Sequence, residues 1–212
     1  RAYARFYAFF LIPMMIVMFG FFIGYLVFWR SITHEPTTVI DLINTIESGG
    51  QSKKWQSALD LARKTDKIKA LSKEDRLYFD KKLSSLYKRS KSDLDYCHMD
   101  TRNYLAATMG SLEDEIYAND LLLGLKDKGM ECQTEEQAKN KFNSKIMAIT
   151  SLGQLDYSNN DILAMRVIDE LIRIIESSDV EISDEVENVI NLHSIIAIGE
   201  IGIDLYWDKT FL

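Results

Sequence analysis

The sequence predicts an all-α fold, with one N-terminal transmembrane helix followed by a domain of stacked helical repeats. Three observations predict it. The first is a run of 24 residues without a charge near the N-terminus, and the second is the absence of proline after Pro36. The third is a short motif that recurs three times and contains a glycine in each copy.

The uncharged run covers residues 6–29. As a helix it would extend roughly 36 Å at about 1.5 Å per residue, enough to cross a hydrocarbon core of about 30 Å. It ends in Trp29 and Arg30, residue types that serve as interface anchors. A cleaved signal peptide has a shorter apolar region and a small-residue cleavage site, which this sequence lacks. We therefore expect a transmembrane anchor over 1–30 and a juxtamembrane linker over 31–35.

Within this run, Gly20 and Gly24 have the small-xxx-small spacing that lets a second membrane helix approach closely. Pro13 lies about two turns earlier. Glycines also occur by chance on the lipid-facing side of membrane spans. The favoured hypothesis is that these glycines form a face that packs against another transmembrane helix.

The rest of the chain is acidic: after Arg30 there are 22 Lys and Arg against 32 Asp and Glu. Such a surface repels nucleic acid and anionic lipid headgroups, so no nucleic-acid partner is expected. Arg1 and Arg5 precede the span, and Arg30 alone follows it closely. The positive-inside rule then places the N-terminus in the cytoplasm and the repeat domain in the periplasm. Cys97 and Cys132 leave the compartment open, because a disulfide and two free thiols fit equally.

Residues 36–212 are expected to be helical throughout, because no proline follows Pro36 and no segment alternates as a half-buried strand would. Apolar residues recur at helical spacing, as in Leu163, Val167, Leu171 and Ile175. Capping signals divide the segment into helices. The expected helices run from Pro36 to about Glu47 and from about Ser52 to Thr65, with two later ones that begin after Ser72 and Thr134.

The recurring motif combines small residues, one glycine and following aliphatic residues. Its glycines, Gly110, Gly153 and Gly199, are 43 and 46 positions apart. A period of about 40 to 47 residues built from helix pairs is typical of HEAT and armadillo arrays. The small residues would allow close approach between stacked helices. The three copies occupy residues 103–114, 145–156 and 193–204.

With this period, the N-terminal span and the stretch SGGQSKKWQSALDLARK at 48–64, the chain resembles bacterial HEAT-repeat proteins that carry one N-terminal membrane helix. The resemblance implies a short HEAT array in the inner membrane and an ABC transporter permease of the macrolide-exporter or lipoprotein-release type as partner. The segments 73–93 and 131–145 are longer than a regular repeat needs, which puts regular curvature in doubt. Trp55 is interpreted as a plug of the first helix pair, with a partner surface as the alternative.

Little in the sequence indicates catalysis. There are three histidines and two cysteines, and the P-loop, GxSxG and HExxH motifs are absent. Cys97, His98 and Asp100 are potential metal ligands, but no second ligand pair accompanies them at zinc-site spacing. A helix N-cap and an ordinary cysteine explain them equally well. His34-Glu35 is half of a metalloprotease motif with Thr38 at the place of the second histidine, and His193 is expected to be packed.

The leading hypothesis is therefore a non-enzymatic accessory subunit, without cofactor or metal, that joins a larger complex in the bilayer of the bacterial inner membrane. The main rival is a membrane-anchored, metal-dependent hydrolase centred on Cys97, His98 and Asp100. A third hypothesis is a free-standing anchored adaptor that binds a peptide or a cell-wall partner.

Overall fold

The computed structural model describes residues 13–25, 38–90, 100–125, 135–177 and 184–207, and the secondary structure of these residues is helical apart from one isolated bridge. Contacts divide the chain into two units, Arg1–Pro36 and Thr37–Leu212. The described part of the first unit is the helix Pro13–Tyr25. The helices of the second unit are α2 (Val39–Ser48), α3 (Gln51–Ala62), α4 (Thr65–Lys69), α5 (Lys73–Arg89), α6 (Asp100–Ser111), the 3-10 helix η2 (Glu115–Tyr117), α7 (Ala118–Leu125), α8 (Glu135–Gly153), α9 (Asp161–Glu176) and α10 (Asp184–Trp207).

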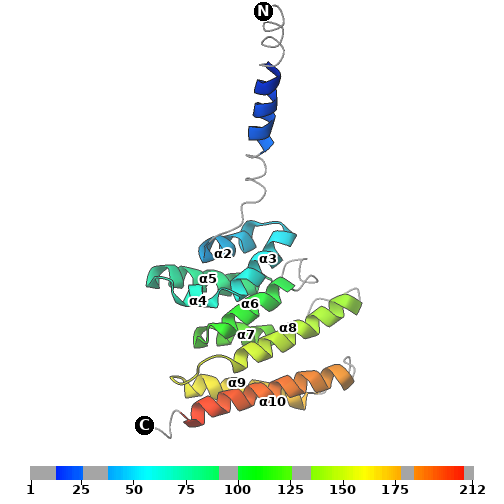
Figure 1. Ribbon diagram of the computed structural model, residues 1–212. Helices are drawn as coiled ribbons and strands as arrows, with labels where there is room; N and C mark the ends of the chain where they lie inside the picture. The colour runs from blue at the N-terminus through cyan, green and yellow to red at the C-terminus, as the bar shows by residue number, and fades with distance from the viewer. Residues whose placement is uncertain (1–12, 26–37, 91–99, 126–134, 178–183, 208–212) are drawn as a thin grey trace, which may run out of the picture. The chain divides into compact units, whose positions relative to one another are not determined.

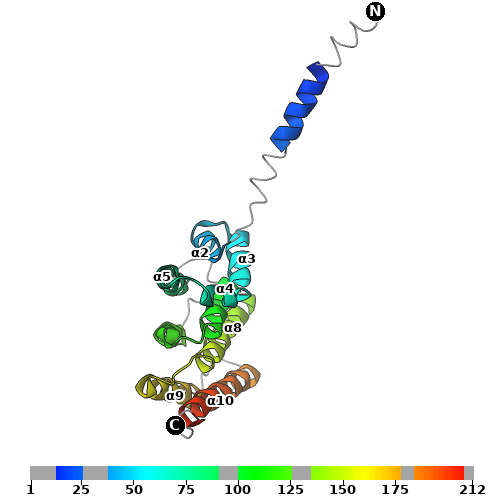
Figure 2. The same ribbon diagram turned by 60° about the vertical axis from the view of Figure 1, so that its left-hand side comes forward.

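The second unit is a stack of helices in two layers, which Figure 2 shows from the side. Helices α3, α6, α8 and α10 follow one another in the first layer, each packed on the next. Helices α2, α5, α7 and α9 follow one another in the second layer. Across the layers, α2 packs on α3, α5 on α6, α7 on α8 and α9 on α10, so the stack consists of four helix pairs (Figure 1).

Local capping decides where the helices begin. Helix α2 begins at Val39 because the Thr38 hydroxyl accepts the Asp41 N–H at 3.0 Å and the Asp41 carboxylate accepts the Thr38 N–H at 3.3 Å. This reciprocal capping box stabilises a start three residues after the one expected at Pro36. At α5 the expected cap is confirmed, since Ser72 accepts the N–H of Asp75 at 3.2 Å. Thr134 lies outside the described residues.

The segment expected to be an insertion, 73–93, contains a full helix of the second layer. Its helix α5 buries Phe79 and Leu83 completely and supplies the helix that pairs with α6. The short helix α4 precedes this segment, between α3 and α5.

The core is continuous along the stack and runs from Val39 in α2 to Ile201 in α10. Its largest fully buried side chains include Phe79, Tyr117 and Tyr157, which lie between the layers. Trp55 is only half-buried on α3, so it is not one of the core aromatic residues.

Among the described residues, the segment Glu185–Ile203 of α10 is long and apolar enough to cross a membrane, with a mean hydropathy of 1.2. The sequence analysis did not single it out. One side of this helix packs into the stack through Ile190, Ala197 and Ile201. The core helix of a soluble protein passes the same test of length and composition. The expected span 6–29 is described only over Pro13–Tyr25, a shorter apolar helix.

Candidate functional site

The repeated glycines mark the contacts between successive helices of the first layer. A Cβ added at Gly110 of α6 would lie 2.8 Å from the Cα of Ser151 in α8. A Cβ at Gly153 of α8 would lie 2.9 Å from the Cα of Ala197 in α10. Real Cβ atoms do not approach a backbone so closely, so both positions need glycine for the helices to pack at this distance.

The two contacts are equivalent. Ser151 stands two positions before Gly153, and Ala197 stands two positions before Gly199. The side chain nearest to Gly110 is Gln154, the residue directly after Gly153. In the same way, the side chain nearest to Gly153 is Glu200, the residue directly after Gly199. Each helix therefore repeats the packing of the one before it, which explains the spacing of the motif.

At Gly199 this series stops. A Cβ added there would meet no described atom within 4 Å, although Gly199 occupies the position of Gly110 and Gly153 in its own copy. In the described part of the chain no further helix follows α10 in the first layer.

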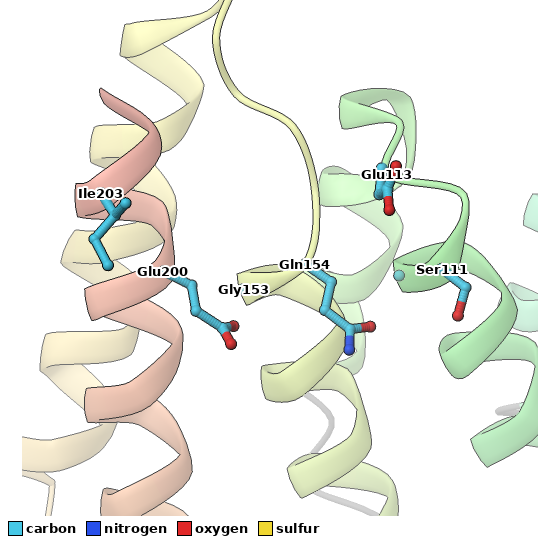
Figure 3. A pocket seen from close by; sticks show the side chains of 7 residues that line it. Ser111, Glu113, Gly153, Gln154, Glu200 and Ile203 are labelled. Atoms are coloured by element: carbon cyan, nitrogen blue, oxygen red, sulfur yellow. The ribbon is translucent and has the colours of Figure 1, made fainter. Parts of the chain in front are cut away.

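A hollow of about 450 Å³ opens beside the ends of α6 and α8 and the C-terminal half of α10, and Figure 3 shows its side chains. The glycines form its floor, and the residue after each glycine projects beside it, namely Ser111, Gln154 and Glu200. The remaining lining residues are Glu113 and Ile203.

The lining of the hollow favours groups that donate hydrogen bonds. Glu113 and Glu200 contribute carboxylates, and Gln154 and Ser111 contribute an amide and a hydroxyl. None of the seven lining residues is a histidine or a cysteine. The arrangement can hold an amide, an ammonium or a guanidinium group.

Glu113 is held in place by three features. Its φ of 56° is the left-handed conformation that ends helices, and it follows the last turn of α6. Its carbonyl accepts the N–H of Asp156 at 3.2 Å, which ties the loops after α6 and α8 together. Its carboxylate pairs with Lys69 at 2.9 Å. The acidic run that begins at Glu113 thus takes part in contacts within the domain.

Polar contacts also join neighbouring helices of the first layer. The Ser144 hydroxyl of α8 donates to the Asn103 side chain of α6 at 2.9 Å. Thr150 of α8 lies 3.1 Å from Nδ1 of His193 in α10. His193 is thus half-buried between two helices of the stack, in the packed environment that the sequence suggested.

On the second layer, Asp80 of α5 is the centre of a polar network. It receives hydrogen bonds from Nε of Arg76 at 2.7 Å and from the Tyr117 hydroxyl, while Arg76 also reaches Asp114 at 3.4 Å. Burial and the neighbouring Asp80 carboxylate raise the pKa of Tyr117 well above its usual value, so the hydroxyl stays a donor. This network fastens α5 to the loop before α7.

The glycines expected in the membrane helix lie on one side of the helix Pro13–Tyr25. Gly20 and Gly24, with Val17, Phe21 and Tyr25, border a shallow groove of about 570 Å³. A Cβ at either glycine would meet nothing within 4 Å in the described structure. Pro13 is the first described residue of this helix.

The remaining candidates are mostly not described. Trp29, Arg30, His34, Cys97, His98 and Cys132 lie outside the described residues, and Asp100 begins α6. Within the described ranges, no group of three or more His, Cys, Asp and Glu side chains is placed to hold a metal ion.

The sequence analysis missed Ser111, Gln154 and Glu200 as lining residues. The signal was present, because each directly follows a repeated glycine. Comparison with family models, with curated proteins and with solved structures found no match to this chain.

Proposed function

We propose that the chain is a non-enzymatic scaffold subunit of a bacterial membrane complex, built from a membrane-anchored HEAT-like array. The observation that carries the proposal is the repeated contact at Gly110 and Gly153. Stacks of equivalent helix pairs form extended surfaces, and proteins built this way act mainly by binding. The polar hollow beside the glycines offers carboxylates and an amide to a partner.

In this proposal the N-terminal helix anchors the chain in the inner membrane and the stack lies in the periplasm. The partner is a membrane complex, and the resemblance of the sequence to HEAT-repeat subunits favours an ABC transporter permease. The groove along Gly20 and Gly24 supports helix packing, because small residues let transmembrane helices approach closely enough for van der Waals contact.

The experiment is mild extraction of the tagged full chain from its host membrane, followed by mass spectrometry of the proteins that co-purify. We expect a membrane complex in fixed ratio to the chain. Gly20→Leu with Gly24→Leu should lower its recovery, because leucine fills the groove. The matched control, Met18→Ile with Phe22→Leu, changes the opposite side of the same helix and should leave recovery unchanged.

Two outcomes would contradict the proposal. One is the absence of any stoichiometric membrane protein with the wild-type chain. The other is purification of the chain alone with a bound metal and hydrolase activity, which would favour the rival enzyme.

A further inference from the structure

The α9–α10 pair carries most of the large exposed apolar side chains of the described stack. On α10, Leu192 and Ile195 are 56% and 57% exposed, and on α9, Met165 is 53% exposed. Lone exposed aliphatic residues are common on protein surfaces, but a contiguous set on one helix pair indicates an interaction site. The large exposed apolar residues of this pair are Ile162, Met165, Ile172, Val189, Leu192, Ile195, Ile196 and Ile203.

Gly199 lies on this exposed side of α10. At Gly110 and at Gly153 the equivalent glycine is covered by the next helix of the first layer, through Ser151 and Ala197. Gly199 offers the same close approach and is open. The same close contact between a glycine and the next helix occurs twice in the stack. It thus specifies how a further helix would pack on α10 at Gly199.

We propose that the exposed face of α10 around Gly199 is a docking site for an amphipathic helix of a protein partner, which packs there as α8 packs on α6. This inference extends the proposed scaffold function by naming the surface and the partner's chemistry. Both helices that cover a glycine in the stack carry the pattern small, aliphatic, glycine, polar, in Ser151 to Gln154 and in Ala197 to Glu200. The partner helix carries a small residue at the same place.

Charge specifies the partner further. Residues 100–212 contain 9 Lys and Arg against 22 Asp and Glu, whereas residues 38–99 contain 13 against 9. The docking face therefore belongs to the strongly acidic part of the chain, and the partner helix has basic residues beside its apolar stripe. A second copy of α10 would bring like charges together, and an anionic lipid surface would be repelled in the same way.

The chain itself provides a probe for this site. A peptide copying residues 138–155 contains the small, aliphatic, glycine, polar pattern, three lysines and no acidic residue. It corresponds to most of α8, the helix that covers Gly110. The fluorescent peptide is titrated with the full chain in nanodiscs of zwitterionic lipid, and binding is followed by anisotropy.

We expect the peptide to bind, and Gly199→Leu in the protein to weaken binding about tenfold or more because the added side chain blocks the close approach. Leu192→Ser should weaken it similarly, whereas Leu123→Ser, an equally exposed position on α7, should not. A peptide with leucine in place of Ser151, and one with glutamates in place of its three lysines, should both bind about tenfold less tightly. Because Gly199→Leu leaves Gly110 unchanged, it separates docking on α10 from displacement of the chain's own α8.

Four results would overturn the proposal. The first is that the peptide does not bind, and the second is that Gly199→Leu leaves its binding unchanged. The third is self-association in sedimentation experiments that Gly199→Leu abolishes, because a second copy of the chain would then be the occupant. The fourth is quenching of Leu192→Trp fluorescence by brominated lipid, which would make the bilayer the occupant. Unchanged co-purification of the membrane complex beside any of these results would leave the scaffold function standing.

Discussion

The two ends of the helical stack differ in what they expose. At the α2–α3 end none of the large apolar side chains of either helix is exposed, and α2 is held to α5 by polar contacts at its edge. Lys82 donates to Glu47, with Arg89 at 3.3 Å from the same carboxylate. At the α9–α10 end eight large apolar side chains are exposed. End repeats need a polar outer face to remain soluble without a partner. Within the described residues, the comparison teaches that the α2–α3 end of the stack is closed and the α9–α10 end is open.

The largest expected effect tests whether α10 is a packed member of the stack. Ile201 is fully buried and Ile203 is 58% exposed on the same helix. Ile201→Ala should lower the free energy of unfolding by about 2–5 kcal/mol, because it leaves a cavity against α8 and α9. Ile203→Ala should change it by less than about 0.5 kcal/mol. Denaturant unfolding followed by circular dichroism measures both, and equal effects would show that α10 does not pack as described.

Tyr117→Phe tests the polar fastening in the first half of the stack. It removes the hydroxyl that donates to Asp80, and hydrogen bonds to charged groups contribute about 1.5–3 kcal/mol. Tyr78→Phe removes a hydroxyl that donates to Asn44 on the exposed surface at 3.0 Å, and should cost less than about 0.5 kcal/mol. The same unfolding measurement compares the two variants. A loss at Tyr117 no larger than at Tyr78 would mean that the hydrogen bond from Tyr117 to Asp80 does not help to hold α5.

The glycine pair contrasts the closed and open contacts of the first layer. Gly153→Ala should destabilise the stack by about 1–3 kcal/mol, since the new Cβ meets the Ala197 backbone. Gly199→Ala should instead stabilise it by about 0.5–1 kcal/mol, because alanine is the better helix former and nothing lies in its way. Thermal unfolding of both variants gives the sign of each change. A destabilising Gly199→Ala would show that α10 is covered in the folded chain.

The smallest effect concerns the ion pair at the closed end. The hydrogen bond from Lys82, followed by its charge, lowers the pKa of Glu47 below 4.5. The resulting stabilisation is present above that pH and is lost as the pH falls through the lowered pKa. Exposed pairs contribute little, so the slope is shallow. Unfolding midpoints measured below pH 4.5 should fall less in Glu47→Gln than in the wild type, and identical curves would exclude a role for this pair.

Part of this picture was predictable from sequence. The helical content of the domain followed from the absence of proline, the cap at Ser72 followed from its spacing to Asp75, and the positions of close contact followed from the repeated glycines. The expected start of the first helix at Pro36 was wrong by three residues, because a reciprocal pair of hydrogen bonds between Thr38 and Asp41 caps the helix at Val39. The burial of Trp55 could not be predicted from sequence, since the type of a side chain does not determine how much of it a neighbouring helix covers.

The sequence by itself determined periodic features, namely which residues form helices and which glycine recurs in each copy, because both depend on local spacing. Only the tertiary structure decided which of those glycines are covered. Gly110 and Gly153 are closed by the next helix of the first layer, and Gly199 is not, although the three look alike in sequence. The same holds for Ser111, Gln154 and Glu200, which are more than 40 positions apart in sequence and line one hollow because α6, α8 and α10 pack one on the next. Local spacing cannot specify such a meeting, since it depends on which helices are neighbours in space.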